Sequence, residues 1–156
     1  MDDQNFLRQF QNCTLPLDQW NHRSHVKATY LYASTYSFDE ALKKMRAAIK
    51  AYNAKHNVPE TATSGYNETT TVAFLTIISS TLYAYAGIFP THSSDEFCDR
   101  HPHLLQKSIL RLFYSPDRRG HPNAKHQFIE PDLTKLPEIK PNKLVQPTSL
   151  RSAVDE

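Results

Sequence analysis

A long stretch without formal charge lies in the middle of the chain. From Thr69 to Ser94 no Asp, Glu, Lys or Arg occurs. Such a stretch is either a membrane span or a helix that is surrounded by protein. Because Thr and Ser recur within it, no unbroken apolar run approaches the ~20 residues that a bilayer requires. We therefore expect a buried central helix and no membrane span.

The rest of the chain also predicts helices. Only three glycines occur among 156 residues, and no Asn-Gly or Asp-Gly pair marks a β-hairpin. Apolar residues recur at helical spacing in several windows, so we expect an all-α fold, a single helical bundle of about four to six helices. The expected helical domain spans residues 1–137. Residues 138–156, interrupted by Pro141 and Pro147, are expected to form an extended or mobile tail.

Capping residues and prolines predict where the helices begin and end. The clearest start is Ser37-Phe38-Asp39-Glu40, a capping box that precedes an apolar helix face running to about residue 56. Gly87 is expected to end the central helix in a left-handed conformation. The further expected helices cover residues 3–11, 16–35, 66–87, 93–100 and 102–113.

Charge and cysteine content narrow the classes of partner. The formal net charge is +2, from 18 Lys and Arg against 16 Asp and Glu, which gives no reason to expect nucleic acid or an anionic membrane as a partner. Cys13 and Cys98 lie far apart and predict neither a disulfide framework nor a cysteine zinc site. The polar amino-terminal sequence resembles no secretory signal, so a cytoplasmic location is expected.

Three ionisable residues are the candidate catalytic groups. His22 and His25 are three residues apart in an expected helix, which places both imidazoles on one face. Glu68 recurs with Leu75 and Leu82 at intervals of seven, so its carboxylate is expected to point inward and to need a partner. We predict that His22, His25 and Glu68 meet inside the fold.

This trio is compatible with two kinds of chemistry. Two imidazoles and one carboxylate form the facial ligand set of a divalent transition metal such as iron or zinc. Without a metal, the histidines can carry a proton during isomerisation, elimination or cyclisation, with Glu68 orienting one of them. Both readings predict an enzyme that acts on a small-molecule substrate. The alternative from another class is a non-catalytic small-molecule binding or interaction protein, and the sequence indicates no particular oligomeric state.

Further polar residues are candidates for binding the substrate. Asn67 can donate a hydrogen bond to a substrate oxygen, although a helix cap is its commoner role. Tyr32 and Tyr66 are the tyrosines expected nearest the site, and each combines apolar area with a polar tip. Lys107 and Arg111 are four residues apart and can bind a substrate anion, although a solvated helix face explains such a pair more often.

Three motifs are distributed along most of the chain. The pattern Leu-Pro-Leu-x-x-Trp-x-His-x-x-His occupies residues 15–25, Gly-Tyr-Asn-Glu-Thr occupies residues 65–69, and Pro-Asp-x-x-x-Leu-Pro occupies residues 131–137. This combination resembles a largely uncharacterised family of short bacterial and fungal proteins. The resemblance implies a shared site rather than a named reaction. Where the family pattern has His before the Glu, this chain has Asn67, which reduces a site of three imidazoles and one carboxylate to two imidazoles and one carboxylate.

Overall fold

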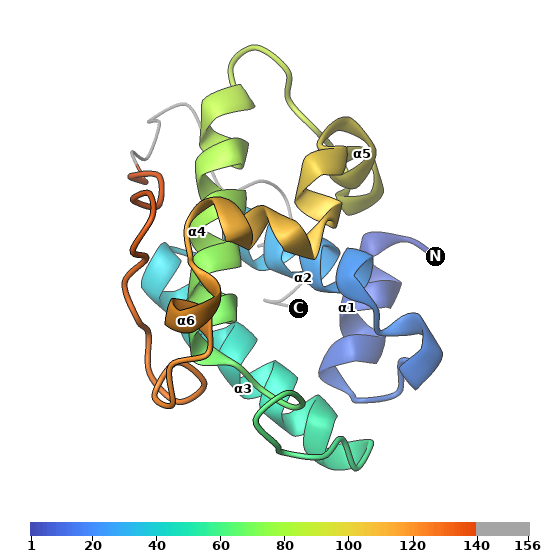
Figure 1. Ribbon diagram of the computed structural model, residues 1–156. Helices are drawn as coiled ribbons and strands as arrows, with labels where there is room; N and C mark the ends of the chain where they lie inside the picture. The colour runs from blue at the N-terminus through green and yellow to red at the C-terminus, as the bar shows by residue number, and fades with distance from the viewer. Residues whose placement is uncertain (140–156) are drawn as a thin grey trace.

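The computed structural model describes residues 1–139, which form an all-α bundle without strands (Figure 1). The expected all-α fold is thereby confirmed. The α-helices are α1 (Asp3–Gln11), α2 (His22–Thr35), α3 (Phe38–Lys55), α4 (Glu68–Tyr85), α5 (Ser94–Arg100) and α6 (Pro116–Arg119). The 3-10 helices are η1 (Leu17–Gln19), η2 (Pro102–Leu105) and η3 (Lys107–Leu112).

Helices α2 and α4 form the centre of the bundle. α2 packs against α1, α3, α4 and α5, and α4 also packs against α3. In Figure 1, α2 crosses the direction of α4 near the middle of the molecule, with α3 on one side of the crossing and α5 on the other. Because α2 has neighbours on most sides, most of its side chains are buried, including Val26 and Tyr30. Polar groups on α2 therefore lie close to the core.

The charge-free stretch lies in α4 as far as Tyr85. Most of its side chains between Glu68 and Ser79 are buried, as expected for a central helix. The hydroxyls of Thr76 and Thr81 donate to the carbonyl oxygens four residues earlier, at 2.8 and 2.9 Å, which satisfies them in apolar surroundings. Within residues 1–139, none of the helices combines the length and the apolar character that crossing a bilayer requires.

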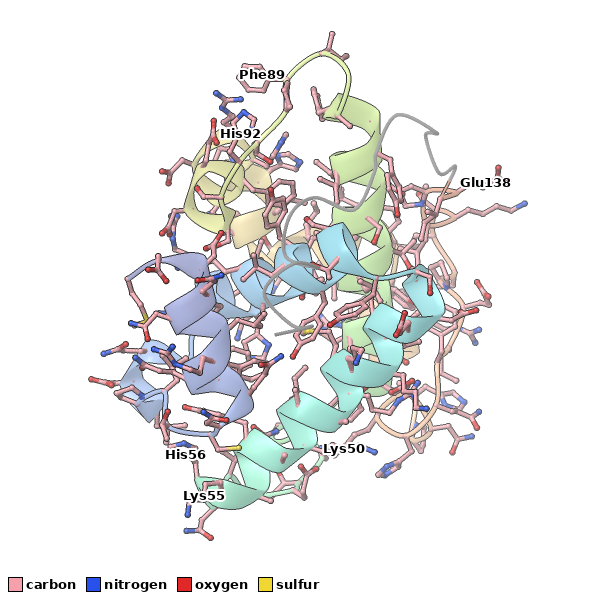
Figure 2. All side chains as sticks on the ribbon, turned by 180° about the vertical axis from the view of Figure 1, so that it is seen from behind. Lys50, Lys55, His56, Phe89, His92 and Glu138 are labelled. Carbon is pink, nitrogen blue, oxygen red and sulfur yellow. The ribbon has the colours of Figure 1, made fainter. Side chains whose placement is uncertain are left out.

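Helix α3 is amphipathic. Its inner face buries Met45, Ile49 and Tyr52. Lys50 and Lys55 lie on the exposed face of the helix (Figure 2), where the ammonium of Lys50 lies 5.0 Å from the ring centroid of Tyr66. This segregation anchors α3 against the core through one stripe of side chains.

Two predicted side-chain caps are confirmed. The Ser37 hydroxyl accepts from the Glu40 amide at 3.3 Å at the start of α3. At the start of α4, Oδ1 of Asn67 accepts from the Thr70 amide at 2.9 Å. Each cap satisfies an amide that has no partner within its own helix. α1 and α5 also occupy the expected ranges, within one residue.

The expected start of α2 was wrong. The helix begins at His22 and not near residues 16–18, because the chain first forms η1 and then turns at Trp20, where ψ is 78°. Asn21 caps the new start by accepting from the Ser24 amide at 3.1 Å. This later start leaves the two histidines on the first turn of the helix.

Two other boundaries also differ from expectation. α4 ends at Tyr85, and Gly87 does not adopt a left-handed conformation. Residues 102–113 form η2 and η3 and not one α-helix, because Gln106 between them is extended, with φ −98° and ψ 110°. The break at this residue brings Lys107 to the start of its own short helix.

The chain after η3 returns to α4 and covers the beginning of that helix. The amides of Glu68 and Thr69 donate to the carbonyl oxygens of Lys125 and Ala124, at 2.9 and 3.1 Å. Figure 1 shows this returning segment following α4 along its length. The expected tail, residues 138–156, lies outside the described residues except for its first two positions.

Candidate functional site

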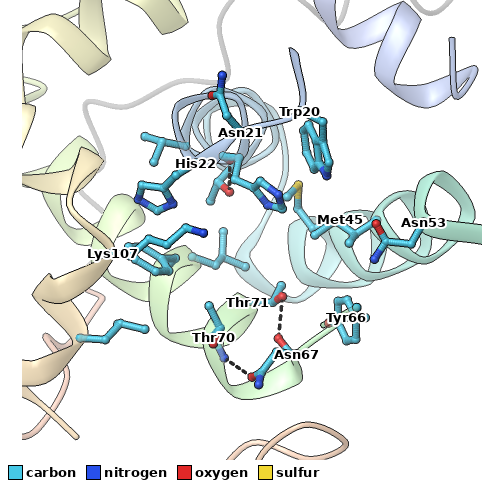
Figure 3. A pocket seen from close by; sticks show the side chains of 18 of the residues that line it. Trp20, Asn21, His22, Met45, Asn53, Tyr66, Asn67, Thr70, Thr71 and Lys107 are labelled. Atoms are coloured by element: carbon cyan, nitrogen blue, oxygen red, sulfur yellow. Dashed lines mark hydrogen bonds between the residues drawn. The ribbon is translucent and has the colours of Figure 1, made fainter. Parts of the chain in front are cut away.

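His22 and His25 line a pocket of about 470 Å³, which we call the histidine pocket. This volume lies within the range typical of small-molecule sites. In Figure 3, His22 and Lys107 lie on one side of the pocket, and Asn53 and Tyr66 lie on the other. The apolar part of the wall comes mainly from α2, α3, α4 and η3: Val26, Met45, Ile49, Phe74, Leu75, Ile78 and Leu110.

His25 packs at a tilt against Trp20, and its ring nitrogens have no partner among residues 1–139. The two ring centroids are 3.9 Å apart, with 33° between the planes. Neither ring nitrogen of His25 forms a hydrogen bond within residues 1–139. The only fully enclosed unpaired side-chain atom in that range is the hydroxyl oxygen of Ser80, so neither nitrogen of His25 is fully enclosed. The imidazole is therefore held by packing and is free to bond to a ligand.

The electrostatic surroundings keep His25 neutral. Burial, His22 and Lys107 together lower the pKa of His25 to about 3. Burial disfavours the charged imidazolium, and the nearby ammonium adds repulsion. At neutral pH the ring therefore offers one donor and one acceptor.

His22 is oriented by the backbone of η2. Its Nε2 lies 2.9 Å from the carbonyl oxygen of Leu104, so Nε2 carries the hydrogen and donates. Nδ1 is then left with its lone pair as an acceptor. Burial lowers the pKa of His22; the bond to Leu104 opposes this effect, and the charge of Lys107 adds to it. His22 thus enters the site as a neutral imidazole in a defined tautomer.

Glu68 is buried, as expected, but its partners are not the histidines. Nε of Arg46 donates to its two carboxylate oxygens at 3.2 and 3.0 Å, and the Tyr66 hydroxyl donates to Oε2. Burial raises the pKa of Glu68, but the bonds from Arg46 and Tyr66 outweigh burial and hold the pKa below its ordinary value. Glu68 does not line the histidine pocket; it lines a second pocket beside Arg46 and Lys50.

Helix α4 lines the histidine pocket with one stripe of side chains. The residues of α4 and its cap in this stripe are Asn67, Thr70, Thr71, Phe74, Leu75 and Ile78, which recur three or four residues apart. Glu68, seven residues before Leu75, lies at the edge of the stripe, and its carboxylate meets Arg46 of α3 instead of the histidines.

The predicted metal-ligand trio is not assembled in the structure. Within residues 1–139 no group of three or more His, Cys, Asp or Glu side chains is placed to hold a metal ion. Glu68 is bonded to Arg46, which leaves His22 and His25 without a carboxylate. Two imidazoles alone do not match the facial ligand set of iron or a catalytic zinc site. The donors therefore do not fit the expected divalent transition metal.

The predicted substrate-binding residues are divided between the pocket and the core. Asn67 and Tyr66 both line the histidine pocket. Tyr32 does not line it: this side chain is buried elsewhere in the core, and its hydroxyl oxygen accepts a hydrogen bond from Gln11 at 3.1 Å. Substrate binding by Asn67 and Tyr66 stays a prediction, and the structure gives Tyr32 a packing role.

Gly65 sets the path by which the chain enters α4. Its φ is +92°, in the region that favours glycine. A Cβ at this position would also overlap the carboxylate of Glu60, whose Oε1 accepts from the Tyr66 amide at 3.1 Å. A larger residue at position 65 would therefore displace the turn that brings Tyr66 and Asn67 to the pocket. This requirement gives the glycine of the Gly-Tyr-Asn-Glu motif a structural reason.

Two basic side chains reach the histidine pocket. Lys107, which the sequence singled out with Arg111, lines it, whereas Arg111 does not. Figure 3 shows the Lys107 side chain extending beside His22 toward the middle of the pocket. Arg119 also lines the pocket and was missed by the sequence analysis. No local pattern marks it, because α6 reaches the site only through the return of the chain after η3.

Comparison of the chain with family models, with curated proteins and with solved structures finds no match. The family resemblance drawn from the three motifs therefore stays an expectation. The functional argument depends on the geometry of the histidine pocket.

Proposed function

We propose that this protein is a small-molecule enzyme that uses metal-free acid–base chemistry in the histidine pocket. The observation that carries the proposal is His25, an imidazole at the wall of a ligand-sized pocket whose two nitrogens have no hydrogen-bond partner among residues 1–139. The contact with Trp20 fixes the plane of the ring. A fixed proton-transfer group avoids part of the entropic cost of orienting it during the reaction. The cytoplasmic location expected from the sequence remains part of this proposal.

The two histidines can divide the proton transfers. In an isomerisation or an elimination, one group removes a proton from carbon and another group delivers a proton elsewhere. His25 is the candidate for the first transfer because its nitrogens have no hydrogen-bond partner in the described part of the chain. His22 offers Nδ1 as a second site, since its Nε2 is engaged with Leu104. Their helical spacing of three residues presents both rings to one bound molecule.

Asn67 is suited to stabilise developing negative charge. Its Oδ1 is occupied by the cap to the Thr70 amide, so its amide group remains as a donor. A donor fixed on a helix start can bind an oxygen that gains charge in the transition state. We assign Asn67 this role in addition to capping α4.

A specific observation favours one alternative, a non-catalytic small-molecule binding protein. No Asp or Glu of the described chain lines the histidine pocket, and the pKa of His25 is about 3. An imidazole with so low a pKa is a weak base at neutral pH unless the bound molecule changes its surroundings. In this alternative, His25 forms hydrogen bonds to a ligand that leaves unchanged.

The two functions are separated by incubating the purified protein with a deproteinised cell extract and following the small molecules by mass spectrometry. Acid–base catalysis predicts time-dependent conversion to products of equal mass, or of mass reduced by one water, which His25→Gln abolishes. His92→Gln, a change at an exposed loop residue, is the matched control and should convert normally. Compounds that are retained by the protein but not converted would establish the binding alternative. Equal conversion by His25→Gln would overturn the assignment of His25.

Independence from metal is tested separately. Protein without a histidine tag, expressed in metal-replete medium, is analysed for iron, zinc and related elements. We expect no stoichiometric metal. Stoichiometric metal that is lost in both His22→Ala and His25→Ala would contradict the metal-free proposal.

A further inference from the structure

We propose that the histidine pocket binds an organic anion, a molecule with an acidic headgroup such as a carboxylate and an apolar body. This inference rests on the proposed function, since it takes the histidine pocket as the ligand site. It adds the chemical class of the ligand and the residues that select it.

The charged side chains of the pocket all carry the same sign. Lys107 and Arg119 line it, and no Asp or Glu of residues 1–139 does so. Neither of these two cations forms an ion pair with any residue in the described part of the chain. A cavity lined by one sign of charge raises the local concentration of ligands of the opposite sign.

The second pocket provides an internal contrast. It is lined by the basic residues Arg46, Lys50 and Lys125, but also by Glu60 and Glu68. Arg46 pairs with Glu68, and Nζ of Lys125 lies 2.9 Å from a carboxylate oxygen of Glu60. Most of its positive charge is thus compensated within the protein. In the histidine pocket no carboxylate of residues 1–139 compensates the charge of Lys107 and Arg119 in this way.

The beginning of α2 adds to the same field. Asn21 caps this helix of 14 residues, and Asn21, His22 and His25 all line the pocket. The N-terminus of a helix carries partial positive charge from aligned peptide dipoles. The neutral imidazole of His25 can add a hydrogen-bond donor. An anion at this end of the pocket would therefore meet a dipole, an ammonium group and an N–H donor.

The rest of the pocket wall is apolar and favours a ligand with an apolar body. Trp20, Ile49 and Phe74 border the cavity and keep part of their surface uncovered. Burial of apolar ligand surface against such side chains favours binding in proportion to the area removed from water. An inorganic ion would leave this part of the pocket unfilled, so the ligand is an amphiphilic organic acid.

Two fluorescent probes of nearly the same shape test the inference. 8-Anilinonaphthalene-1-sulfonate carries an anionic group, and N-phenyl-1-naphthylamine is its uncharged analogue. Titration of the full chain with each probe measures the contribution of the charge directly. We expect the anionic probe to bind more tightly than the neutral probe, and Lys107→Gln to weaken the anionic probe about tenfold.

Control variants distinguish a failure of the anion inference from a failure of the proposed function. Lys107→Gln should leave the affinity for the neutral probe unchanged. Arg111 lies on the same 3-10 helix but does not line the pocket, so Arg111→Gln should leave the affinities for both probes unchanged. If the neutral probe binds and Lys107→Gln does not affect the anionic probe, the anion inference is overturned while the small-molecule site stands. If neither probe binds, both the inference and the proposed function are contradicted.

Discussion

The ring of Trp20 packs at a tilt against His25, with 3.9 Å between the ring centroids, and its centroid lies 4.4 Å from that of Phe10, on which it stacks. Since Trp20 is the only tryptophan of the chain, its emission reports on the imidazole beside it. An imidazolium quenches indole fluorescence more strongly than a neutral imidazole does. The contact with His25 therefore gives the histidine pocket an intrinsic probe.

Trp20 emission should stay nearly constant between pH 7.5 and pH 5. The pKa of His25 is about 3, so this ring remains neutral throughout that range. Emission intensity and lifetime, recorded at constant ionic strength, measure the effect. A quenching step centred near pH 6.5 in the wild type that disappears in His25→Gln would show that His25 titrates normally and would refute the prediction.

The free energy of unfolding should fall as the pH is lowered from 7.5 to 5. The pKa of His25 is about 3 in the folded protein and near 6.5 in the unfolded chain, so the unfolded state binds the extra proton between these values. The stability that the neutral form of His25 contributes is fully present above pH 6.5 and is lost progressively below it. At pH 5 the contribution of His25 to this loss is about 2 kcal/mol.

Urea unfolding at the two pH values measures this loss. His25→Gln should remove most of the contribution of His25, whereas His92→Gln should keep the wild-type pH dependence. The pKa of Glu68 is held below 4.5, so stability from its ionised form is present above that pH and is lost as the pH falls further. The change in the free energy of unfolding between pH 7.5 and pH 5 therefore reports on histidines. An unchanged pH dependence in His25→Gln would count against the low pKa.

Arg46→Gln should lower the free energy of unfolding by about 2 kcal/mol at pH 7, because it leaves the buried carboxylate of Glu68 without its cation. The cost is smaller than for a fully buried pair, since 38% of the Arg46 side chain is exposed. Lys43→Gln, at an exposed position on the same helix, is the control. A loss no larger than that of the control would mean that the pair contributes little.

Glu68→Gln should leave the histidines unaffected. Glu68 bonds to Arg46 and Tyr66 and does not line the histidine pocket. The pH profile of Trp20 emission and the affinity for the anionic probe are therefore expected to match the wild type. A shift of the histidine titration in Glu68→Gln, followed by NMR of the ring protons, would instead place this carboxylate in contact with His22 or His25.

Two substitutions at Asn67 separate its structural role from its position in the pocket. Asn67→Ala removes the cap of α4 and should cost about 1 kcal/mol of stability. Asn67→Asp keeps a capping oxygen at a helix N-terminus and should remain close to wild-type stability. Asn67→Asp should nevertheless weaken the anionic probe, since it adds a negative charge to the pocket wall. Equal probe binding by Asn67→Asp and the wild type would place the anion away from Asn67.

Local sequence determined most of the helices. Ser37 and Asn67 predicted helix starts correctly, because a side-chain cap depends only on residues within one turn. The charge-free stretch correctly predicted a central helix, but only its part up to Ser79 is buried, and Tyr85, Ile88 and Phe89 are exposed. The start of α2 was predicted too early, because Pro16 and Asp18 belong to η1 and its start and not to α2. The cap by Asn21 is a local signal of the same kind as Ser37 and Asn67, and it marks the observed start.

The sequence by itself also established that Glu68 points inward, since burial follows from its phase on a helix. It could not say which neighbour the carboxylate meets. Only the tertiary structure decided this, by packing the Glu68 side of α4 against Arg46 of α3 and the adjacent stripe against the histidines. The convergence of His25, Lys107 and Arg119 on one pocket was decided in the same way, because these side chains come from α2, η3 and α6. Helix periodicity fixes the direction of a side chain relative to its own axis, whereas the partner depends on how separate axes pack.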